Sequence, residues 1–424
     1  MADEVVYPKY RWLLLFLGWL LYGLIAFNNT MTAVLYDLLE AAPVGLGLTT
    51  TQFYVSLTAT SVAPIVLAIF GGMMADRYGV KRIVLLGAIV ALAGTMLRLV
   101  SFGFIDFFIY NIMLGIGLGV VFPNLPKIVG LWFPPKQIAI ATGLYMTALG
   151  LGSGLGLAIG PLFPTWRTAM LVMGIVFAAS IVIWLLFAKD RPKGYKLGGV
   201  EIAGVPLKEG LVKAISSKYI WLIAVSYCLI AGVSQAYVNG APLLLVEERS
   251  VAGAAAGQAV ALAFLGFFAG TVFWVTLAEK LGVTKPIYMF CMIAAGVTAI
   301  LMYQLAPGGG MWIMGVATGF CMGAGHPFIM QVPLRLREIG PRYAGSASGL
   351  IASLGHLLSF LLLPFMFTPI WDAFGGLSAV FFLAAAMLVG GVLYILVPET
   401  GRRARDRWAT EEAEPSAPVD KPAS

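Results

Sequence analysis

Charged residues are scarce in this sequence. Asp, Glu, Lys and Arg make up 11% of the 424 residues, whereas hydrophobic residues make up 60%. A soluble domain of this length needs a charged surface to stay in solution, so this balance excludes one. The sequence therefore predicts a protein whose main solvent is lipid.

Long polar stretches are also scarce, because apolar runs of about 20 residues recur along the chain. Each run matches the length that a helix needs to cross a hydrocarbon core of about 30 Å. We predict an all-α membrane protein with twelve transmembrane helices, at 12–35, 50–75, 83–103, 105–130, 138–162, 167–188, 219–246, 252–277, 286–304, 311–334, 343–366 and 376–397.

Histidine and cysteine are rare as well. The chain has two histidines, and its three cysteines show no CxxC or metal-ligand spacing. The sequence has no Walker loop and no soluble domain that could hydrolyse ATP. We expect no cofactor and no metal, and we do not expect an enzyme, because two separated histidines lack a carboxylate partner.

Basic residues gather on one side of the predicted spans. Of the 27 Lys and Arg residues, 23 fall in the N-terminal tail, the even-numbered loops and the C-terminal tail, whereas Arg167 and Arg249 fall in odd-numbered loops. Loops rich in Lys and Arg stay in the cytoplasm. We therefore expect a multi-pass protein of the cell inner (plasma) membrane with both termini cytoplasmic. The net charge of +7 then reflects membrane topology, and no nucleic acid is expected as a partner.

The chain divides into two similar halves around the polar residues 189–218. Gly115, Gly119 and Pro123 in span 4 match Gly319, Gly323 and Pro327 in span 10, and two further matches follow in the same order with nearly the same offset, in the range 203 to 206. Duplication is the simplest account. We predict an N-terminal six-helix bundle at 1–188, a cytoplasmic central loop at 189–218, a C-terminal six-helix bundle at 219–400 and a disordered cytoplasmic tail at 401–424. Within the loop, a short helix would place Leu207, Leu211 and Ile215 on one face.

The loop after span 2 reads GMMADRYGVKR from Gly72 to Arg82. This loop resembles the cytoplasmic signature of the major facilitator superfamily, and the twelve spans, the central loop and a similar sequence at 278–282 also fit that family. The resemblance implies two pseudo-symmetric six-helix bundles (the MFS fold) that rock around a central solute site. It also implies a gate in which Asp76 contacts the N-terminal end of span 11 and Glu279 that of span 5. The predicted gate residues are Gly72, Asp76, Arg77, Gly79, Lys81 and Glu279.

Three further features bear on the resemblance. Asn111 stands where span 4 of the family usually begins with an arginine, which puts the proton-linked role of that arginine in doubt. Gly152, Gly156 and Gly160 partly resemble the glycine-proline signature of antiporters, or they allow close helix packing. The stretch 122–136 looks like the same region of small-anion and organic-anion porters.

Ionisable side chains within the spans are few, and each is costly in lipid. Arg98, near the outer end of span 3, either pairs with Asp106 or extends to the membrane surface. Lys127 lies one helical turn from Asn124 in span 4, and it either meets an anion or extends to the cytoplasmic surface. No Asp or Glu lies deep in any predicted span.

Polar residues of span 1 have counterparts in span 7. An offset of 207 places Gln235 and Asn239 opposite Asn28 and Thr32. Matched amides at similar depth suit a site on the interface between repeats, or they link neighbouring helices. With the two histidines, which either bind solute or pack between helices, the predicted substrate-binding residues are Asn28, Asn29, Asn124, Lys127, Gln235, Tyr237, His326 and His356.

These observations favour a secondary active or facilitative transporter that moves a small solute by alternating access. Because the candidate charges are Lys127 and the histidines, we expect an organic or inorganic anion. The alternative is a neutral or amphipathic solute, including drug efflux, and a non-transporting membrane sensor or a membrane enzyme is a remote alternative. The expected partners are the solute, the lipid bilayer and a coupling ion, with the protein acting as a monomer. Asn111 and the absence of a buried acid favour uniport or exchange over proton symport.

Overall fold

The structure, a computed structural model, describes residues 8–40, 45–190, 207–336 and 338–413, apart from some side chains within helices. In this part of the chain, twelve helices are long and apolar enough to cross a membrane, and no strand occurs. A helix is favoured in lipid because it satisfies its backbone hydrogen bonds within one segment. These findings confirm the predicted all-α membrane protein with twelve spans.

The first six spans occupy the first half of the chain. They are α1 (Arg11–Ala33), α3 with η1 and α4 (Thr50–Thr58, Ala59–Ser61 and Val62–Tyr78), α5 with η2 (Val80–Leu97 and Arg98–Val100), α6 (Phe104–Trp132), α7 with η3 (Pro135–Ile159 and Gly160–Leu162) and α8 (Trp166–Phe187). The short α2 (Tyr36–Glu40) follows α1, and α9 (Leu207–Ser216) is the helix expected in the central loop.

The other six spans follow α9. They are α10 (Lys218–Arg249), α11 (Gly253–Leu281), α12 (Lys285–Gln304), α13 with α14 (Gly309–Met322 and Gly325–Arg335), α15 with η4 and α16 (Gly340–Leu362, Leu363–Phe367 and Thr368–Phe374) and α17 with η5 (Gly376–Leu393 and Tyr394–Leu396). The span predicted at 311–334 is thus interrupted at Gly323 and Ala324, at mid-depth.

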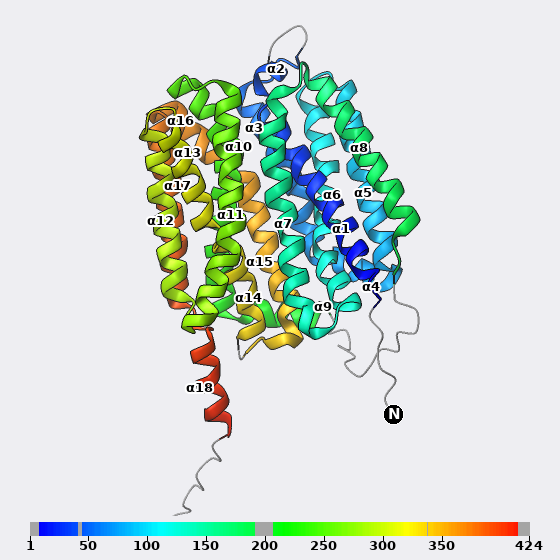
Figure 1. Cartoon of the computed structure of the whole chain (residues 1–424), viewed down its shortest axis with the longest axis vertical. Helices are drawn as coiled ribbons and strands as arrows, with labels where there is room; N and C mark the ends of the chain where they lie inside the picture. The colour runs from blue at the N-terminus through cyan, green and yellow to red at the C-terminus, as the bar shows by residue number, and fades with distance from the viewer. Residues whose placement is uncertain (1–7, 41–44, 191–206, 337, 414–424) are drawn as a thin grey trace, which may run out of the picture.

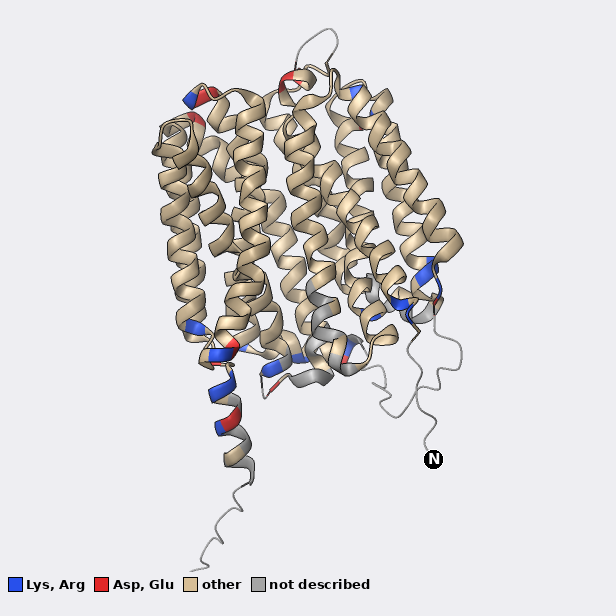
Figure 2. Ribbon diagram, viewed as in Figure 1, with Lys and Arg blue, Asp and Glu red and all other residues tan. Residues whose placement is uncertain are grey.

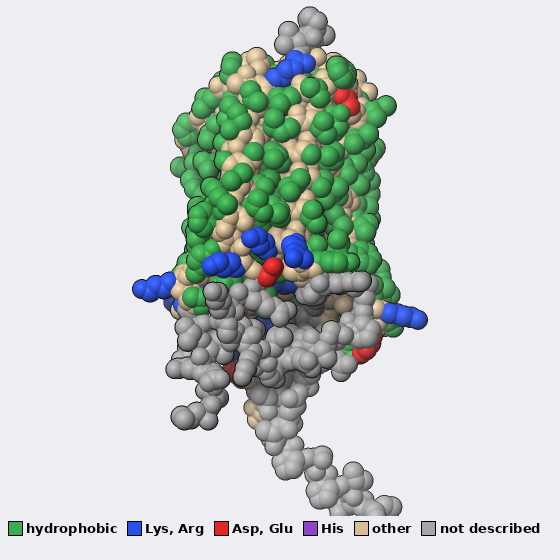
Figure 3. Space-filling view, turned by 90° about the vertical axis from the view of Figure 1, so that its right-hand side faces the viewer, with side chains coloured by type: hydrophobic (Ala, Val, Ile, Leu, Met, Phe, Trp, Pro, Cys, Tyr) green, Lys and Arg blue, Asp and Glu red, His purple; other side chains and the backbone are tan. Residues whose placement is uncertain are grey.

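The spans of the two halves stand side by side (Figure 1), with α7 packed against α11 and α4 packed against α15 where the halves meet. The start of α1 and the helix α18 (Arg402–Ala413) lie at the same end of the molecule. Figure 2 shows most Lys and Arg side chains near this end, which we call the basic end. The opposite end carries α2, and we call it the α2 end. Figure 3 shows hydrophobic side chains over most of the outer face of the first half between these ends, as a lipid-facing surface requires.

Glycines allow the closest helix contacts. A Cβ atom at Gly152 would overlap the backbone of Gly23, one at Gly156 would overlap Thr30, and one at Gly160 would overlap Val34, the residue that follows α1. Lipid provides no hydrophobic force between helices, so such close approach is what holds α1 against α7. Of the two interpretations of these three glycines, the structure shows the packing role.

The repeated glycines of spans 4 and 10 have the same packing role in each half. A Cβ at Gly115 would overlap the carbonyl oxygen of Thr60 in η1, and a Cβ at Gly319 would overlap that of Ala263 in α11. Span 4 thus packs against span 2, and span 10 packs against span 8, in both cases through backbone contact. This agreement supports a duplicated unit.

The tail differs from the expectation of disorder. Arg402–Ala413 forms α18, whereas residues 414–424 lie outside the described part. Its Arg, Ala and Glu residues have high helix propensity, which does not depend on a hydrophobic core. The backbone N–H of Arg403 also donates to the carbonyl oxygen of Gly282 (3.1 Å), which anchors the start of the helix to the end of α11.

Candidate functional site

Five tyrosine and histidine side chains from both halves lie near the middle of their spans, and we call them the tyrosine–histidine cluster: Tyr22 of α1, Tyr145 of α7, Tyr227 of α10, His326 of α14 and His356 of α15. The three tyrosines are 4%, 2% and 8% exposed, respectively, so their hydroxyl groups are buried at membrane depth.

Aromatic contacts form two matched pairs within this cluster. The Tyr22 ring lies 5.2 Å from that of Phe122 in the first half, and the Tyr227 ring lies 5.1 Å from that of His326 in the second half. The sequence offsets, 205 for the tyrosines and 204 for their partners, fall within the range that relates the two halves. The second half thus carries an imidazole where the first half carries a phenyl ring.

Electrostatic proximity joins the halves across their interface. The Tyr22 hydroxyl is within range of direct electrostatic interaction with Tyr227 and Tyr145. His356 is similarly close to His326, so a charge on one imidazole would oppose a charge on the other. The cluster therefore groups hydrogen-bonding side chains from five spans, two of the first half and three of the second, near the middle of the molecule.

His326 sits where a helix begins. The break at Gly323 and Ala324 makes His326 the second residue of α14, and its ring also lies 6.2 Å from Phe267 of α11. Its Nδ1 atom is buried and has no hydrogen-bond partner within the described residues. A ring nitrogen that no described residue hydrogen-bonds, at the positive end of a helix, has the chemistry to bind a polar solute group.

The amides predicted in span 1 are already engaged inside the first half. Asn28 is fully buried, donates through Nδ2 to Thr95 Oγ1 (2.8 Å) and accepts a hydrogen bond from Arg98. Asn29 accepts a hydrogen bond from Thr60 Oγ1 (3.1 Å). These contacts agree with the helix-linking alternative.

The predicted residues of span 4 lie on α6, on the side of Phe122 that faces the basic end. Asn124 is fully buried and donates through Nδ2 to the carbonyl oxygen of Val120 (2.7 Å). Lys127 is partly buried, closer to the basic end of α6. This places one basic side chain between the cluster and that end.

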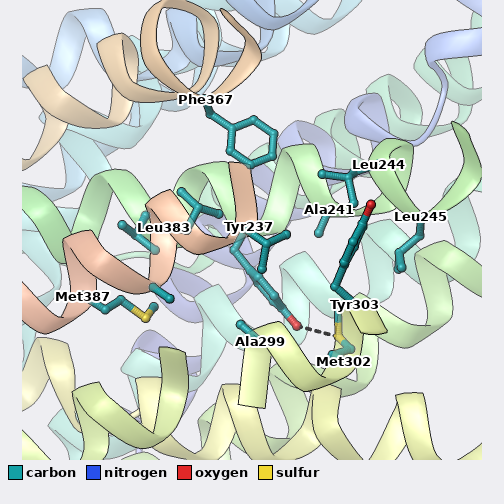
Figure 4. A pocket seen from close by; sticks show the side chains of 13 residues that line it. Tyr237, Ala241, Leu244, Leu245, Ala299, Met302, Tyr303, Phe367, Leu383 and Met387 are labelled. Atoms are coloured by element: carbon teal, nitrogen blue, oxygen red, sulfur yellow. Dashed lines mark hydrogen bonds between the residues drawn. The ribbon is translucent and has the colours of Figure 1, made fainter. Parts of the chain in front are cut away.

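The predicted residues of span 7 point in different directions. The carbonyl oxygen of Gln235, whose side chain is partly buried, accepts a hydrogen bond from Asn239 Nδ2 (3.0 Å). Tyr237 lines an apolar pocket formed by α10, α12, η4 and α17, and its hydroxyl contacts Met302 Sδ at 3.0 Å (Figure 4). Tyr237 therefore lies inside the second half, and the structure does not bring it together with Tyr22 and Tyr145.

The predicted gate residues lie at the basic end. Gly79 joins α4 to α5 with a φ of 89°, which favours glycine, and a side chain there would press against Asp190. Lys81 donates through its backbone N–H to Asp190 Oδ1 (2.7 Å) and through Nζ to the carbonyl oxygen of Leu185 (2.9 Å). Gly72, Asp76 and Arg77 belong to α4, but their side-chain positions lie outside the described part, so the expected contact of Asp76 with span 11 stays a prediction.

The second half repeats this arrangement. Lys285 donates through its backbone N–H to Glu399 Oε2 (3.1 Å) and through Nζ to the carbonyl oxygen of Ile395 (2.8 Å). Glu279 forms an ion pair with Arg335 (2.7 Å) at the end of α14. The side chains at the start of α7 are mostly outside the described part, so the expected contact of Glu279 with span 5 also stays a prediction.

The carboxylate of Glu399 caps the N-terminus of α12. Burial alone would raise the pKa of Glu399, but hydrogen bonds from the Thr284 hydroxyl and from the backbone N–H groups of Lys285, Gly401 and Thr284 outweigh it. The pKa of Glu399 is therefore lower than its ordinary value.

The tyrosines of the cluster were missed at the level of sequence. Tyrosine is common at helix contacts, so none of the three stood out from the hydrophobic runs around it. The available signal was the repeat itself, because the offset of 205 pairs Tyr22 with Tyr227. No group of histidine, cysteine or acidic residues suited to a metal occurs within the described residues.

Comparisons with known proteins agree with this architecture. A family model of the Major Facilitator Superfamily matches residues 18–363. The 3-(3-hydroxy-phenyl)propionate transporter of Escherichia coli K12 is 29% identical over 305 residues, covering 69% of this chain and 73% of the relative. A probable sulfoacetate transporter of Cupriavidus necator is 23% identical, covering 82% of this chain and 85% of the relative.

A solved structure shares the fold. The crystal structure of a bacterial homologue of the human lysosomal transporter Spinster, in an inward-facing and unoccupied conformation, matches with a TM-score of 0.69 and 17% identity. The match covers 92% of this chain and 96% of that one.

Proposed function

The chain belongs to the major facilitator superfamily, and from this premise we propose that it carries an organic anion across the cell inner membrane by alternating access. The observation that carries the proposal is the tyrosine–histidine cluster, which takes side chains from both halves at mid-membrane depth. A site shared by two halves can open to either side when the halves rock, because neither half holds the solute alone.

The chemistry of the cluster suits a carboxylate attached to a planar group. Tyrosine hydroxyls and imidazole N–H groups donate hydrogen bonds to carboxylate oxygens, and the rings of Phe122 and Tyr22 offer faces for stacking. The N-terminal end of α14 adds a partial positive charge beside His326. The described acids of α6 and α10, namely Asp106, Glu247 and Glu248, lie near helix ends, away from the cluster.

The names of the relatives support the same class of solute. The relative from Escherichia coli is named for a phenylpropionate, an aromatic carboxylate, and that from Cupriavidus necator for sulfoacetate, a small dianion. The three buried tyrosines favour the aromatic acid. Lys127 provides a cation on the route from the cluster to the basic end.

The remaining features describe how the halves move. The six-helix bundles 1–188 and 219–400 rock as units around the cluster, and the basic end faces the cytoplasm because its charges obey the positive-inside rule. Asp76 and Glu279 latch the basic end in the outward-facing state through contacts with the N-terminal ends of α15 and α7. The protein works as a monomer, by uniport or exchange.

Binding by the purified full-length protein tests the proposal. We expect 3-(3-hydroxyphenyl)propionate to raise the melting temperature, because a ligand that binds only the folded state stabilises it. Its primary amide has nearly the same shape but no charge, and we expect it to bind at least about tenfold more weakly, a difference of about 1.4 kcal/mol. Equal binding of the two compounds would favour the alternative of a neutral or amphipathic solute.

A further inference from the structure

Arg98 carries a positive charge into the interior of the first half. Its side chain is fully buried, in the 3-10 turn η2 that ends span 3. The guanidinium lies between α1 and α6, where it donates to Asn28 Oδ1, to Thr32 Oγ1 (3.1 Å) and to Asn111 Oδ1 (3.4 Å). Its Nε atom has no hydrogen-bond partner within the described residues.

All three acceptors of this guanidinium are neutral. Asp106, the acid nearest in sequence, accepts hydrogen bonds from the backbone N–H groups of Phe102 (2.6 Å) and Gly103 (3.0 Å) and caps α6. Both expectations for Arg98, a pair with Asp106 and an extension to the membrane surface, are therefore wrong. Three neutral oxygens keep the guanidinium solvated, and no carboxylate of the described residues forms an ion pair with it.

The charge of Arg98 lies close to the tyrosine–histidine cluster. Asn28, which binds the guanidinium, is six residues after Tyr22 on α1. At a rise of about 1.5 Å per residue, the charge is displaced by about 9 Å along the helix axis from Tyr22, toward the α2 end. Arginine keeps its charge throughout the physiological pH range, so this field does not depend on protonation.

We propose that Arg98 is a specificity-determining residue that favours anionic solutes in the cluster without touching them. The inference rests on the proposed function, because it concerns the charge preference of the same site. Across about 10 Å at an effective dielectric constant of about 20, a unit positive charge favours a monovalent anion over its neutral analogue by a factor of about ten. Asn111 contributes by holding the guanidinium where span 4 passes it.

The test compares the purified full-length protein with Arg98→Gln and Arg98→Lys. Dissociation constants are measured for 3-(3-hydroxyphenyl)propionate and for its primary amide. We expect Arg98→Gln to weaken binding of the carboxylate about tenfold and that of the amide less than about twofold. Arg98→Lys retains the charge, and we expect it to restore most of the preference for the carboxylate.

Arg167→Gln is the matched control. Arg167 is an exposed arginine whose Nε donates to the carbonyl oxygen of Leu99 (3.4 Å), so it lies beside the same turn but in contact with solvent. Because solvent and salt screen an exposed charge, we expect this variant to keep the wild-type preference.

The outcomes separate the two proposals. A wild-type protein that binds the carboxylate and the amide equally overturns the proposed function and, with it, the role of Arg98. A wild-type preference that Arg98→Gln retains overturns the role of Arg98 alone. Equal losses for both compounds in Arg98→Gln and Arg98→Lys also overturn it, since they indicate a structural role.

Discussion

Tyr227 and Tyr237 lie on the same helix, but their hydroxyl groups face different surroundings. Tyr227 packs against His326, where the halves meet, whereas the Tyr237 hydroxyl contacts Met302 inside the second half. Position along a span does not determine which neighbour a side chain meets, because successive residues on a helix point in directions about 100° apart.

We expect Tyr227→Phe to weaken binding of 3-(3-hydroxyphenyl)propionate about five- to tenfold, because one hydrogen bond to a charged group is lost. Tyr237→Phe is the matched control, and it should change the dissociation constant less than about twofold. Both variants keep the ring, so both should remain folded. Titration calorimetry on wild type and the two variants measures the dissociation constants. A larger loss of affinity in Tyr237→Phe than in Tyr227→Phe would indicate that the solute binds inside the second half.

His326 and His356 are the imidazoles of the cluster, and histidine is the residue type whose unperturbed pKa lies nearest to neutral pH. We expect solute uptake into proteoliposomes to be independent of an imposed pH gradient, because the protein is proposed to act by uniport or exchange. Radiolabelled solute provides the measurement. Accumulation that follows the gradient and disappears in the double variant His326→Gln, His356→Gln would instead identify the histidines as proton carriers.

At the scale of elements, the two halves share a helix cap. In each half, an acid that follows the sixth span accepts a hydrogen bond from the start of the third span. Asp190 accepts from the backbone N–H of Lys81 at the start of α5, and Glu399 accepts from that of Lys285 at the start of α12. Lys81 also donates through Nζ to the carbonyl oxygen of Leu185 in the last turn of α8. Lys285 donates through Nζ to that of Ile395 in η5, which follows α17. The same element is thus stabilised in the same way in each half.

Glu399→Gln should lower the melting temperature at pH 7, because the variant loses charge-assisted hydrogen bonds to the start of α12. A cap of this kind contributes about 1 kcal/mol, and less where water screens the half-exposed carboxylate. The folded-state pKa of Glu399 is below its ordinary value of 4.5. Its stabilising effect is therefore full above pH 4.5 and lost as the pH falls through the folded-state pKa.

We thus expect the melting temperatures of wild type and Glu399→Gln to differ at pH 7 and to converge in acid. Scanning calorimetry across this pH range provides the measurement, and Thr276→Ala, a change on an exposed face of α11, serves as a control. A difference that is the same at all pH values would show that the charge of Glu399 does not matter.

At the scale of the whole molecule, transport requires contacts between the two halves to form at one end while they break at the other. Asp76→Asn should slow transport several-fold and leave the dissociation constant of the solute within about threefold, since the residue is proposed to act on the conformational equilibrium. Initial rates and equilibrium binding, measured on the same preparation, separate the two effects. Normal turnover in this variant would contradict the latch.

Orientation is a second property of the whole molecule. We expect Phe102→Cys at the α2 end, where Phe102 is 92% exposed, to react with an impermeant maleimide added to intact cells. Arg402→Cys at the start of α18 should react after permeabilisation, because the basic end is proposed to face the cytoplasm. The parent protein, with its three native cysteines, is the control. The reverse labelling pattern would invert the topology.

The sequence by itself determined the twelve spans, the repeat offsets and the family resemblance. These properties are local or periodic: a helix in lipid needs a long apolar run, and the positive-inside rule counts charges in loops. Helix α18 was missed because its propensity was judged by apolar content, although Arg, Ala and Glu favour a helix without burial.

Only the tertiary structure decided which side chains meet. It separated Tyr237 from the interface, brought Tyr22, Tyr145 and Tyr227 together, and turned Arg98 away from Asp106 and toward Asn28 and Asn111. The physical reason is that apolar residues surround most of each span, so hydrophobic periodicity does not indicate which face looks inward. In α6, α7 and α13, close packing of glycines against neighbouring backbones fixes which face of the helix looks inward, and this places the polar side chains.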